Sequence, residues 1–128
     1  MMTRISSREL PLRTVRIGQR IVYCEYPTAS KDREHGLKGR DFLFDHKGML
    51  FDTYGRYQPL FTMKGVIFDL EAIFVGNDYR VKDIVPMRKN DGSTAYTTPL
   101  RVPIKWVIEV NKGWSQKNNV KLGDMVVI

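Results

Sequence analysis

Alternation of hydrophobic and polar residues near the start of the chain predicts a β-hairpin. Within residues 15–26, the side chains of Val22, Cys24 and Tyr26 fall on one side of an extended backbone, and the intervening residues fall on the other. Gly18 lies between the two halves, and a glycine-containing turn is typical of hairpins. We therefore expect two paired strands that end before Pro27.

The most apolar part of the chain, Phe61 to Val75, predicts a buried strand. From Leu70 to Val75 most residues on both faces are apolar, which is typical of a central strand covered on both sides. The pair Asn77-Asp78 then gives a turn signal. Tyr79 to Val85 is the expected partner strand.

The remaining segments predict short elements joined by turns. Thr28 and Ser30 are the expected N-caps of the first of two short helices. Residues 54–59 are expected to be a loop, and Trp114 is expected to pack inward. Short strands are expected at residues 48–53, 104–110 and 125–128, and short helices at residues 31–37 and 112–118.

These elements together indicate the fold class. Many short strands, two short helices and no regular alternation of strand and helix favour a mainly β protein. We expect a single compact, mostly antiparallel β-barrel or β-clam with two short helices.

Two segments look suited to reaching a neighbouring molecule. Residues 1–20 contain five arginines against the single acid Glu9, in a chain of net charge +7. They are interpreted as a basic amino-terminal arm or a first strand, ahead of a β domain over residues 21–128. Residues 86–103 are polar and long for a connection, so they form either a mobile loop or a contact arm.

The single cysteine and the lack of long apolar segments indicate the compartment of the protein. Cys24 is the single cysteine, so no internal disulfide is expected. The amino terminus has no apolar run typical of a signal peptide, and no stretch approaches the ~20 apolar residues that span a bilayer. These features predict a soluble protein that is not secreted by a signal peptide. We expect it in the cytoplasm or in a particle assembled there.

Six short segments follow one another in a fixed order along the chain. They are Arg33-Glu34-His35-Gly36-Leu37-Lys38-Gly39-Arg40, Gly48-Met49-Leu50-Phe51, Phe61-Thr62-Met63-Lys64, Trp106-Val107-Ile108-Glu109-Val110, Gly113-Trp114 and Val120-Lys121-Leu122-Gly123-Asp124. Their order and spacing resemble a known family, the domain of unknown function 192. The resemblance covers about residues 21–128 and implies a small β-rich fold without an agreed activity. The central family motif, Phe-Trp-Met-Lys-Asn followed by Pro-Leu-Asp, reads here as residues 61–65 and 69–71 with changes at four positions.

The candidate ligand-binding residues are Met63, Lys64 and Glu71, which fall in this motif. A buried lysine near a carboxylate can bind an anionic ligand or act as an acid/base pair. The alternative is a structural ion pair between Lys64 and Glu71 that orients the motif. Asp69 lies two residues before Glu71 on the same strand face, but paired carboxylates do glycosidase-type work only in a cleft.

No enzyme, metal or cofactor signature is found in the sequence. Cys24, His35 and His46 show none of the spacings that mark a metal site, and no phosphate-binding glycine motif or nucleophile elbow is present. We therefore expect no catalytic residues, no metal and no cofactor.

These observations lead to two functional hypotheses. The first is a non-enzymatic structural or assembly protein, for example a capsid or virion accessory protein, that contacts a protein partner or itself. Nucleic acid is a further possible partner of the basic arm, and a membrane is not expected. The alternative is a small-ligand-binding module at the Lys64/Glu71 end of the barrel. The residues expected to make partner contacts are Arg4, Arg8, Arg13, Arg16, Asn90 and Asp91.

Overall fold

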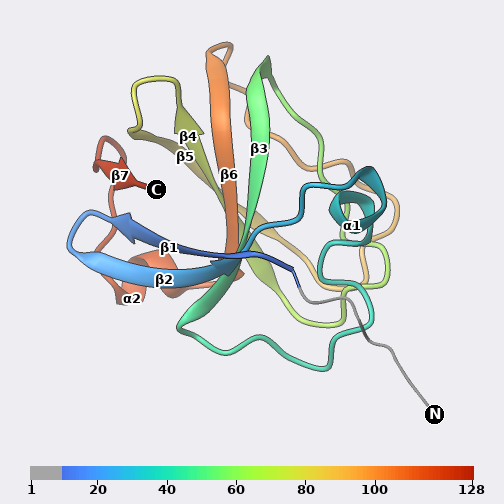
Figure 1. Cartoon of the computed structure of the whole chain (residues 1–128). Coiled ribbons are helices and arrows are strands. Elements are labelled where there is room, and N and C mark those ends of the chain that lie inside the picture. Colours follow the sequence, from blue (N-terminus) through green and yellow to red (C-terminus); the bar gives the residue numbers. More distant parts are fainter. Residues whose placement is uncertain (1–9) are drawn as a thin grey trace.

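The part of the chain that the structure describes, residues 10–128 of a computed structural model, forms one curled sheet with two short helices (Figure 1). The mainly β content with a small helical part confirms the predicted class. The strands are β1 (Leu12–Ile17), β2 (Arg20–Glu25), β3 (Lys47–Tyr57), β4 (Leu70–Gly76), β5 (Val81–Met87), β6 (Pro103–Asn111) and β7 (Val126–Val127), and the helices are α1 (Ser30–His35) and α2 (Trp114–Lys117).

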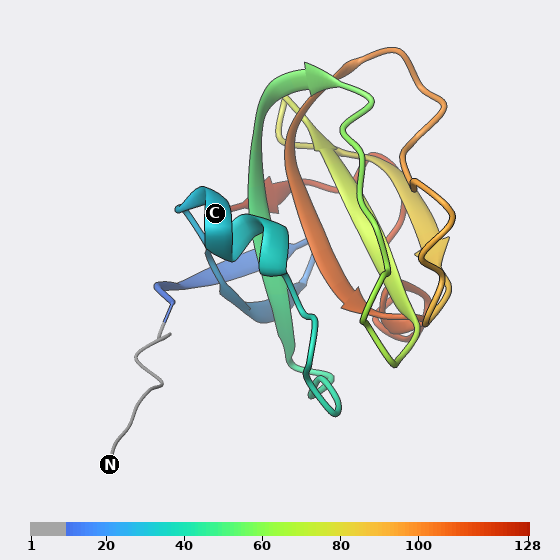
Figure 2. The ribbon, with the colours of Figure 1, turned by 90° about the vertical axis from the view of Figure 1, so that its right-hand side faces the viewer.

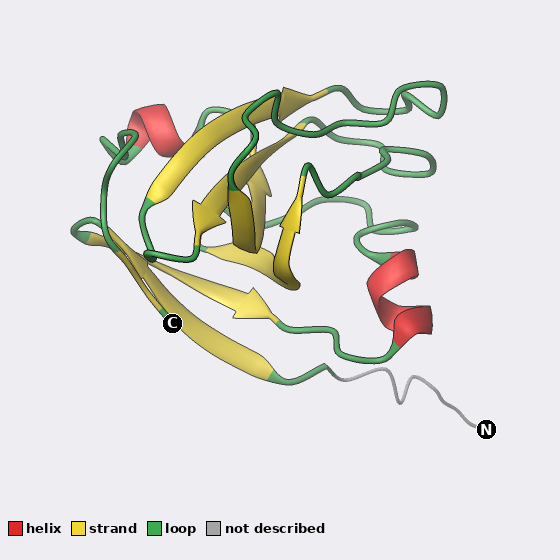
Figure 3. Cartoon of the chain, turned by 90° about the horizontal axis from the view of Figure 1, so that it is seen from above, coloured by secondary structure: helices red, strands yellow, loops and turns green. Residues whose placement is uncertain are grey.

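The seven strands lie in the order β5-β4-β6-β3-β2-β1-β7. Neighbouring strands are antiparallel except β2 and β3, which run parallel. The sheet curls so far that Arg80 and Met125, next to its two edge strands, meet in an isolated bridge (Figure 3). A closed barrel needs a continuous ladder around its circumference. The structure is therefore a curled half-barrel. The predicted barrel is wrong in one respect, because the sheet is not closed.

The predicted hairpin is confirmed as β1 and β2. Ile17 pairs with Arg20 across the turn, where Gly18 takes a φ of 59°, a conformation that favours glycine. Val22 and Cys24 are fully buried, whereas Tyr23 is 46% exposed. The alternation in the sequence therefore reports correctly which side of the hairpin faces the core.

The inner face of the curl holds one hydrophobic cluster. It joins side chains of both ends of the sheet, such as Val15 of β1 and Val75 of β4, and it includes Trp114 of α2. Trp114 is 4% exposed, as the sequence predicts. Contacts between strands at opposite ends of the sheet keep it curled.

A second hydrophobic cluster covers the outer face of β3, β6 and β4. It contains Leu70 and Phe74 of β4 together with Leu37 and Met63 from the loops that fold over the sheet. Every residue of β4 is buried, which confirms the predicted central strand over residues 70–75, whereas residues 61–69 lie outside the strands. Buried side chains on both faces explain why β4 lacks the alternation seen in β2.

Two predicted boundaries are wrong. Helix α1 follows Ala29, and no side chain caps its first turn, so neither Thr28 nor Ser30 acts as the expected N-cap. Strand β3 continues to Tyr57 through residues that were expected to be a loop. An irregularity between Asp52 and Arg56 shifts the register and lets the strand pair with β6 again.

The polar segment 86–103 is held against the outer face. Strand β5 extends to Met87, and beyond it Tyr96 pairs with Phe61 through two backbone hydrogen bonds of 2.9 and 2.7 Å. The carboxyl group of Asp91 accepts hydrogen bonds from the backbone of Ser93 at 3.1 Å and from the hydroxyl of Tyr96 at 2.6 Å. These contacts tie the segment to itself and to the sheet.

Candidate functional site

A cavity of about 560 Å³ lies between helix α1, the outer face of β3 and β6, and the segment after β3. Figure 2 shows α1 lying alongside β3. The lining of the cavity contains both apolar and charged side chains. The lining residues are Arg33, Glu34, His35, Gly36, Leu37, Lys38, Phe51, Thr53, Arg56, Pro59, Leu60, Phe61, Thr62, Val66 and Glu109.

Glu109 of β6 is the buried acid of this cavity. Its neighbours Ile108 and Val110 belong to the inner cluster, whereas Val107 belongs to the outer one, so alternation along β6 directs Glu109 to the outer face. Glu109 is 5% exposed. Burial raises the pKa of its carboxyl group from an ordinary 4.5 to about 8. The group is therefore mostly uncharged at neutral pH.

No group within residues 10–128 hydrogen-bonds to the side chain of Glu109. Its two cross-strand partners, Met49 on β3 and Ala72 on β4, are apolar. The side-chain oxygens of Glu109 are not completely enclosed by protein, and the residue lines the cavity. The carboxyl group of Glu109 is therefore a hydrogen-bonding group that the fold leaves open toward the cavity.

Arg33 brings a guanidinium group from α1 to the same cavity. Its Nη2 donates a hydrogen bond of 2.8 Å to the backbone carbonyl of Asp52, which ties α1 to β3. Its Nη1 is buried and has no partner within the described residues. The guanidinium carbon also lies 5.5 Å from the ring centre of Tyr54, and that of Arg56 lies 5.9 Å from the same ring. Both cations are thus held near the cavity.

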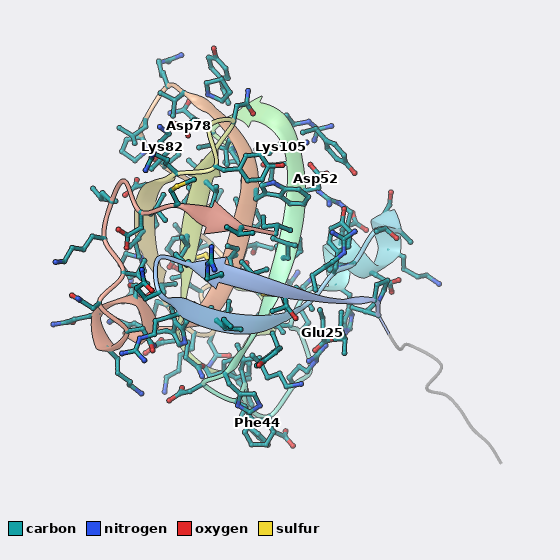
Figure 4. The ribbon with its side chains drawn as sticks, turned by 60° about the vertical axis from the view of Figure 1, so that its left-hand side comes forward. Glu25, Phe44, Asp52, Asp78, Lys82 and Lys105 are labelled. Atoms are coloured by element: carbon teal, nitrogen blue, oxygen red, sulfur yellow. The ribbon has the colours of Figure 1, made fainter. Side chains whose placement is uncertain are left out.

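The carboxyl group of Asp52 lies 3.9 Å from the ammonium group of Lys105 on β6, and Figure 4 shows the two side chains together. Both side chains are partly exposed, and solvent screening makes such ion pairs weak. Arg33 therefore depends on the backbone of β3, and not on this carboxylate, for its position.

Two aromatic rings, those of Phe51 and Phe61, form part of the apolar lining. Phe51 and Phe61 pack edge to face with their ring centres 5.4 Å apart, and Phe61 packs on Phe74 at 6.2 Å. Leu37, which follows α1, is 1% exposed and belongs to the same cluster. Such packed rings hold a fixed shape, so the apolar lining is suited to the apolar part of a ligand.

The residues that the sequence indicated as ligand-binding lie elsewhere. Met63 is fully buried in the outer cluster, and Lys64 is exposed on the surface. The carboxyl oxygens of Glu71 accept hydrogen bonds of 2.9 Å from the backbone of Gly113 and of Ser115, and one from the Ser115 hydroxyl. Glu71 thus caps α2, and within residues 10–128 no ion pair joins it to Lys64.

The residues expected to contact partners are spread over the surface. Arg13 lies over the ring of Tyr26 at 4.6 Å, and Arg16 is exposed on β1. Asn90 is exposed and Asp91 is partly buried in the segment after β5. Arg4 and Arg8 lie outside the described residues. Because residues 12–17 form β1 between β2 and β7, that part of the segment is a strand of the sheet and not an arm.

The candidate metal-binding side chains are not brought together. Cys24 is in the inner cluster, where burial raises the pKa of its thiol to about 12, and His35 lines the cavity. His46 lies beside Phe44 on another loop. Within residues 10–128 no three histidine, cysteine or acidic side chains are grouped so as to hold a metal ion.

Neither helix of the described residues is long and apolar enough to cross a membrane.

Glu109 and Arg33 line the cavity but are not among the candidate site residues that the sequence indicates. Glu109 could have been found, because it is a single acid within the otherwise apolar run Trp106 to Val110. A charged residue in a strand that is buried on both faces needs a partner or a function. Arg33 gives no such signal, since charged residues are common in short surface helices.

Comparisons with known proteins agree with this fold. The family DUF192, described as an uncharacterised ACR, matches residues 13–128. The chain belongs to the DUF192 family. No curated protein matches it significantly.

Two crystal structures resemble this DUF192 protein closely in fold. A protein of unknown function from Novosphingobium aromaticivorans DSM 12444 has a TM-score of 0.86 and 26% identity, over 97% of this chain and 90% of that one. A protein from Sinorhizobium meliloti 1021, described as a putative transcription regulator, has a TM-score of 0.84 and 22% identity, over 95% and 97% of the two chains. The second likeness concerns the fold alone.

Proposed function

We propose that this DUF192 protein is a non-enzymatic small-molecule-binding module whose site is the cavity lined by Glu109 and Arg33. The observation that carries the proposal is the carboxyl group of Glu109, which is buried at the cavity without a hydrogen-bond partner. A ligand in the cavity can supply the hydrogen bond that the protein does not make to this group. The volume of about 560 Å³ lies within the range of small-molecule sites.

The test is a two-dimensional NMR titration of the full chain with a panel of small organic molecules. Bound compounds should shift the amide signals of residues that line the cavity, such as Phe61 and Val66. Glu109→Leu should weaken this binding by about tenfold or more, because it removes the polar anchor. The matched control is Lys64→Met, which changes an exposed residue outside the cavity lining and should leave binding unchanged.

The same pair of variants separates this site from the one that the sequence suggested. Loss of binding in Lys64→Met, with binding kept in Glu109→Leu, would return the site to the Lys64/Glu71 end of the sheet. A panel that shifts no cavity signal in the wild-type protein would overturn the proposal.

Assembly remains a second candidate function, favoured by an exposed aromatic loop. Phe42 and Phe44 are each 57% exposed, and their ring centres lie 4.8 Å apart. The loop is fixed by a 2.6 Å hydrogen bond from Asn111 to the carbonyl of Leu43 and by an ion pair of Asp45 with Lys117 at 2.7 Å. Figure 4 shows Phe44 at the outer edge of the molecule. Fixed, exposed aromatic side chains are typical anchors of protein contacts.

Sedimentation velocity tests the self-association form of this second candidate. The wild-type chain should sediment faster than a 14.9 kDa monomer, and a variant with Phe42→Ser and Phe44→Ser should return to the monomer. A wild-type protein that stays monomeric at high concentration would argue against it.

A further inference from the structure

The chemistry of the cavity limits the ligands that it can accept, if the proposed function holds. Arg33 and Glu109 both line the cavity. Nη1 of Arg33 has no partner within residues 10–128, and no group there hydrogen-bonds to the carboxyl group of Glu109. A guanidinium group only donates hydrogen bonds, and an un-ionised carboxyl group donates through its O–H. A molecule that binds to both side chains must therefore supply acceptor oxygens.

The charges around the cavity favour an anion. Three cationic side chains, those of Arg33, Lys38 and Arg56, line the cavity. The acids there are the exposed Glu34 and Glu109, which is mostly uncharged at neutral pH. A cleft lined by an excess of positive charge attracts anions and repels cations. The titratable side chains that line the cavity besides Glu109 are Arg33, Glu34, His35 and Lys38 from α1 and the turn after it, and Arg56 from β3. The strand residues opposite Glu109 are apolar.

The apolar side chains that line the cavity favour a ligand that also has an apolar part. Leu37, Phe51 and Phe61 contribute hydrocarbon surface, and these side chains belong to the outer hydrophobic cluster. Contact with this lining removes apolar ligand surface from water, which favours binding. A fully polar anion such as inorganic phosphate would leave this lining unused.

We propose that the cavity binds small organic carboxylates with an apolar body. The carboxylate accepts hydrogen bonds from the Arg33 guanidinium and from the protonated Glu109, and the apolar body packs on Phe51 and Phe61. This inference rests on the proposed function and narrows it to one ligand class. The contrasting class is an organic amine, which would pair with an ionised Glu109 in place of accepting hydrogen bonds from it.

Isothermal titration calorimetry of the full chain with hexanoate and hexylamine tests the inference. The two probes have the same chain length and opposite charge, and both stay charged between about pH 6.5 and about pH 9. Hexanoate should bind more tightly than hexylamine at the lower pH. Its affinity should fall about tenfold at the higher pH, because Glu109 then loses the proton it donates.

Two variants separate the roles of the groups. Glu109→Gln keeps a donor that does not titrate in this range, so it should keep hexanoate binding and lose most of the pH dependence. Arg33→Gln should weaken hexanoate binding by about ten- to a hundredfold, because a hydrogen bond to a charged group is lost. Glu34→Gln is the control at the same cavity and should leave the pH dependence in place.

The possible results distinguish an incorrect ligand class from an incorrect binding site. Tighter binding of hexylamine, increasing with pH and abolished by Glu109→Gln, would overturn the carboxylate class and keep the cavity as the site. The class would also be overturned if neither probe bound while other members of the NMR panel shifted the cavity signals. If no compound bound at all, the proposed function itself would fail.

Discussion

At the scale of single residues, the surroundings of Glu109 decide its chemistry. An exposed glutamate is an ordinary surface anion, but this one lies between the buried residues Ile108 and Val110. Burial in an apolar environment disfavours the charged form, which raises the pKa of the carboxyl group to about 8. The residue is thereby converted from a charge into a hydrogen-bond donor at neutral pH.

The raised pKa of Glu109 predicts that the stability of the protein depends on pH. Between about pH 4.5 and about pH 8 the unfolded chain releases a proton that folded Glu109 retains. The stabilising contribution of the neutral group is complete below about pH 4.5 and is lost as the pH rises to about 8. Within this window, the free energy of unfolding should fall by up to about 1.4 kcal/mol per pH unit from this group.

Urea denaturation at several pH values checks this prediction. Glu109→Gln removes the titration, so its stability relative to wild type should increase as the pH rises. Glu34→Gln, an exposed change at the same cavity, should follow the wild-type curve. Parallel curves for wild type and Glu109→Gln would show that burial does not perturb the group.

Gly48 of β3 gives a second prediction at this scale. A Cβ atom there would lie 2.8 Å from the backbone oxygen of Glu109 and 3.3 Å from Sγ of Cys24. Gly48→Ala should therefore lower the free energy of unfolding by about 1–3 kcal/mol, as overpacking does. The control is Gly92→Ala, where the nearest contact is a flexible Lys64 side chain at 3.5 Å. Equal melting temperatures for the two variants would contradict the close approach.

At the scale of elements, helix α2 depends on a side chain from a distant strand. Its four residues are too few for a stable isolated helix, and its first turn is capped by Glu71 of β4. One glutamate therefore joins α2, which carries Trp114 into the inner cluster, to the centre of the sheet.

Removing this cap should destabilise the protein and leave the cavity intact. Glu71→Ala leaves three donors on Gly113 and Ser115 without their acceptor, so we expect a loss of about 1–3 kcal/mol in the free energy of unfolding. Glu71→Gln keeps one acceptor and should cost less. Chemical denaturation measures both, and compounds that bind the cavity should bind Glu71→Gln as well as wild type. Loss of that binding would instead support a ligand role for Glu71.

At the scale of the whole molecule, the curl of the sheet is maintained through β1. This strand pairs with β2 on one side and with the short β7 on the other, and β7 in turn meets the β4–β5 turn through Met125 and Arg80. The inner cluster is enclosed only when these contacts bring the two ends of the sheet together.

Two truncations test this arrangement. Deletion of residues 1–9 keeps every strand of the described part, so the chain should still unfold cooperatively. Deletion of residues 1–17 removes β1 and exposes the inner cluster, and we expect loss of the cooperative thermal transition in near-ultraviolet circular dichroism. A sharp transition in the longer deletion would show that β1 is an accessory arm.

The sequence by itself determined the local features of this protein. The alternation around Val22 and Cys24 predicted the hairpin, and the largely apolar run from Leu70 to Val75 predicted the buried central strand. Both are encoded in neighbouring residues, because side chains on a strand alternate with a period of two. The order of short segments also led to the correct family.

Only the tertiary structure decided the sheet order and the cavity. The parallel pairing of β2 with β3 and the return of β3 to β6 after its irregular residues depend on contacts between distant segments. The cavity joins residues near 33–38, 51–62 and 109, which no local pattern links. Glu71 and Glu109 are both acids in apolar strands, yet one faces the donors of α2 and the other faces an open cavity. The physical reason is that a partner for a buried polar group comes from whichever segment the fold places opposite it.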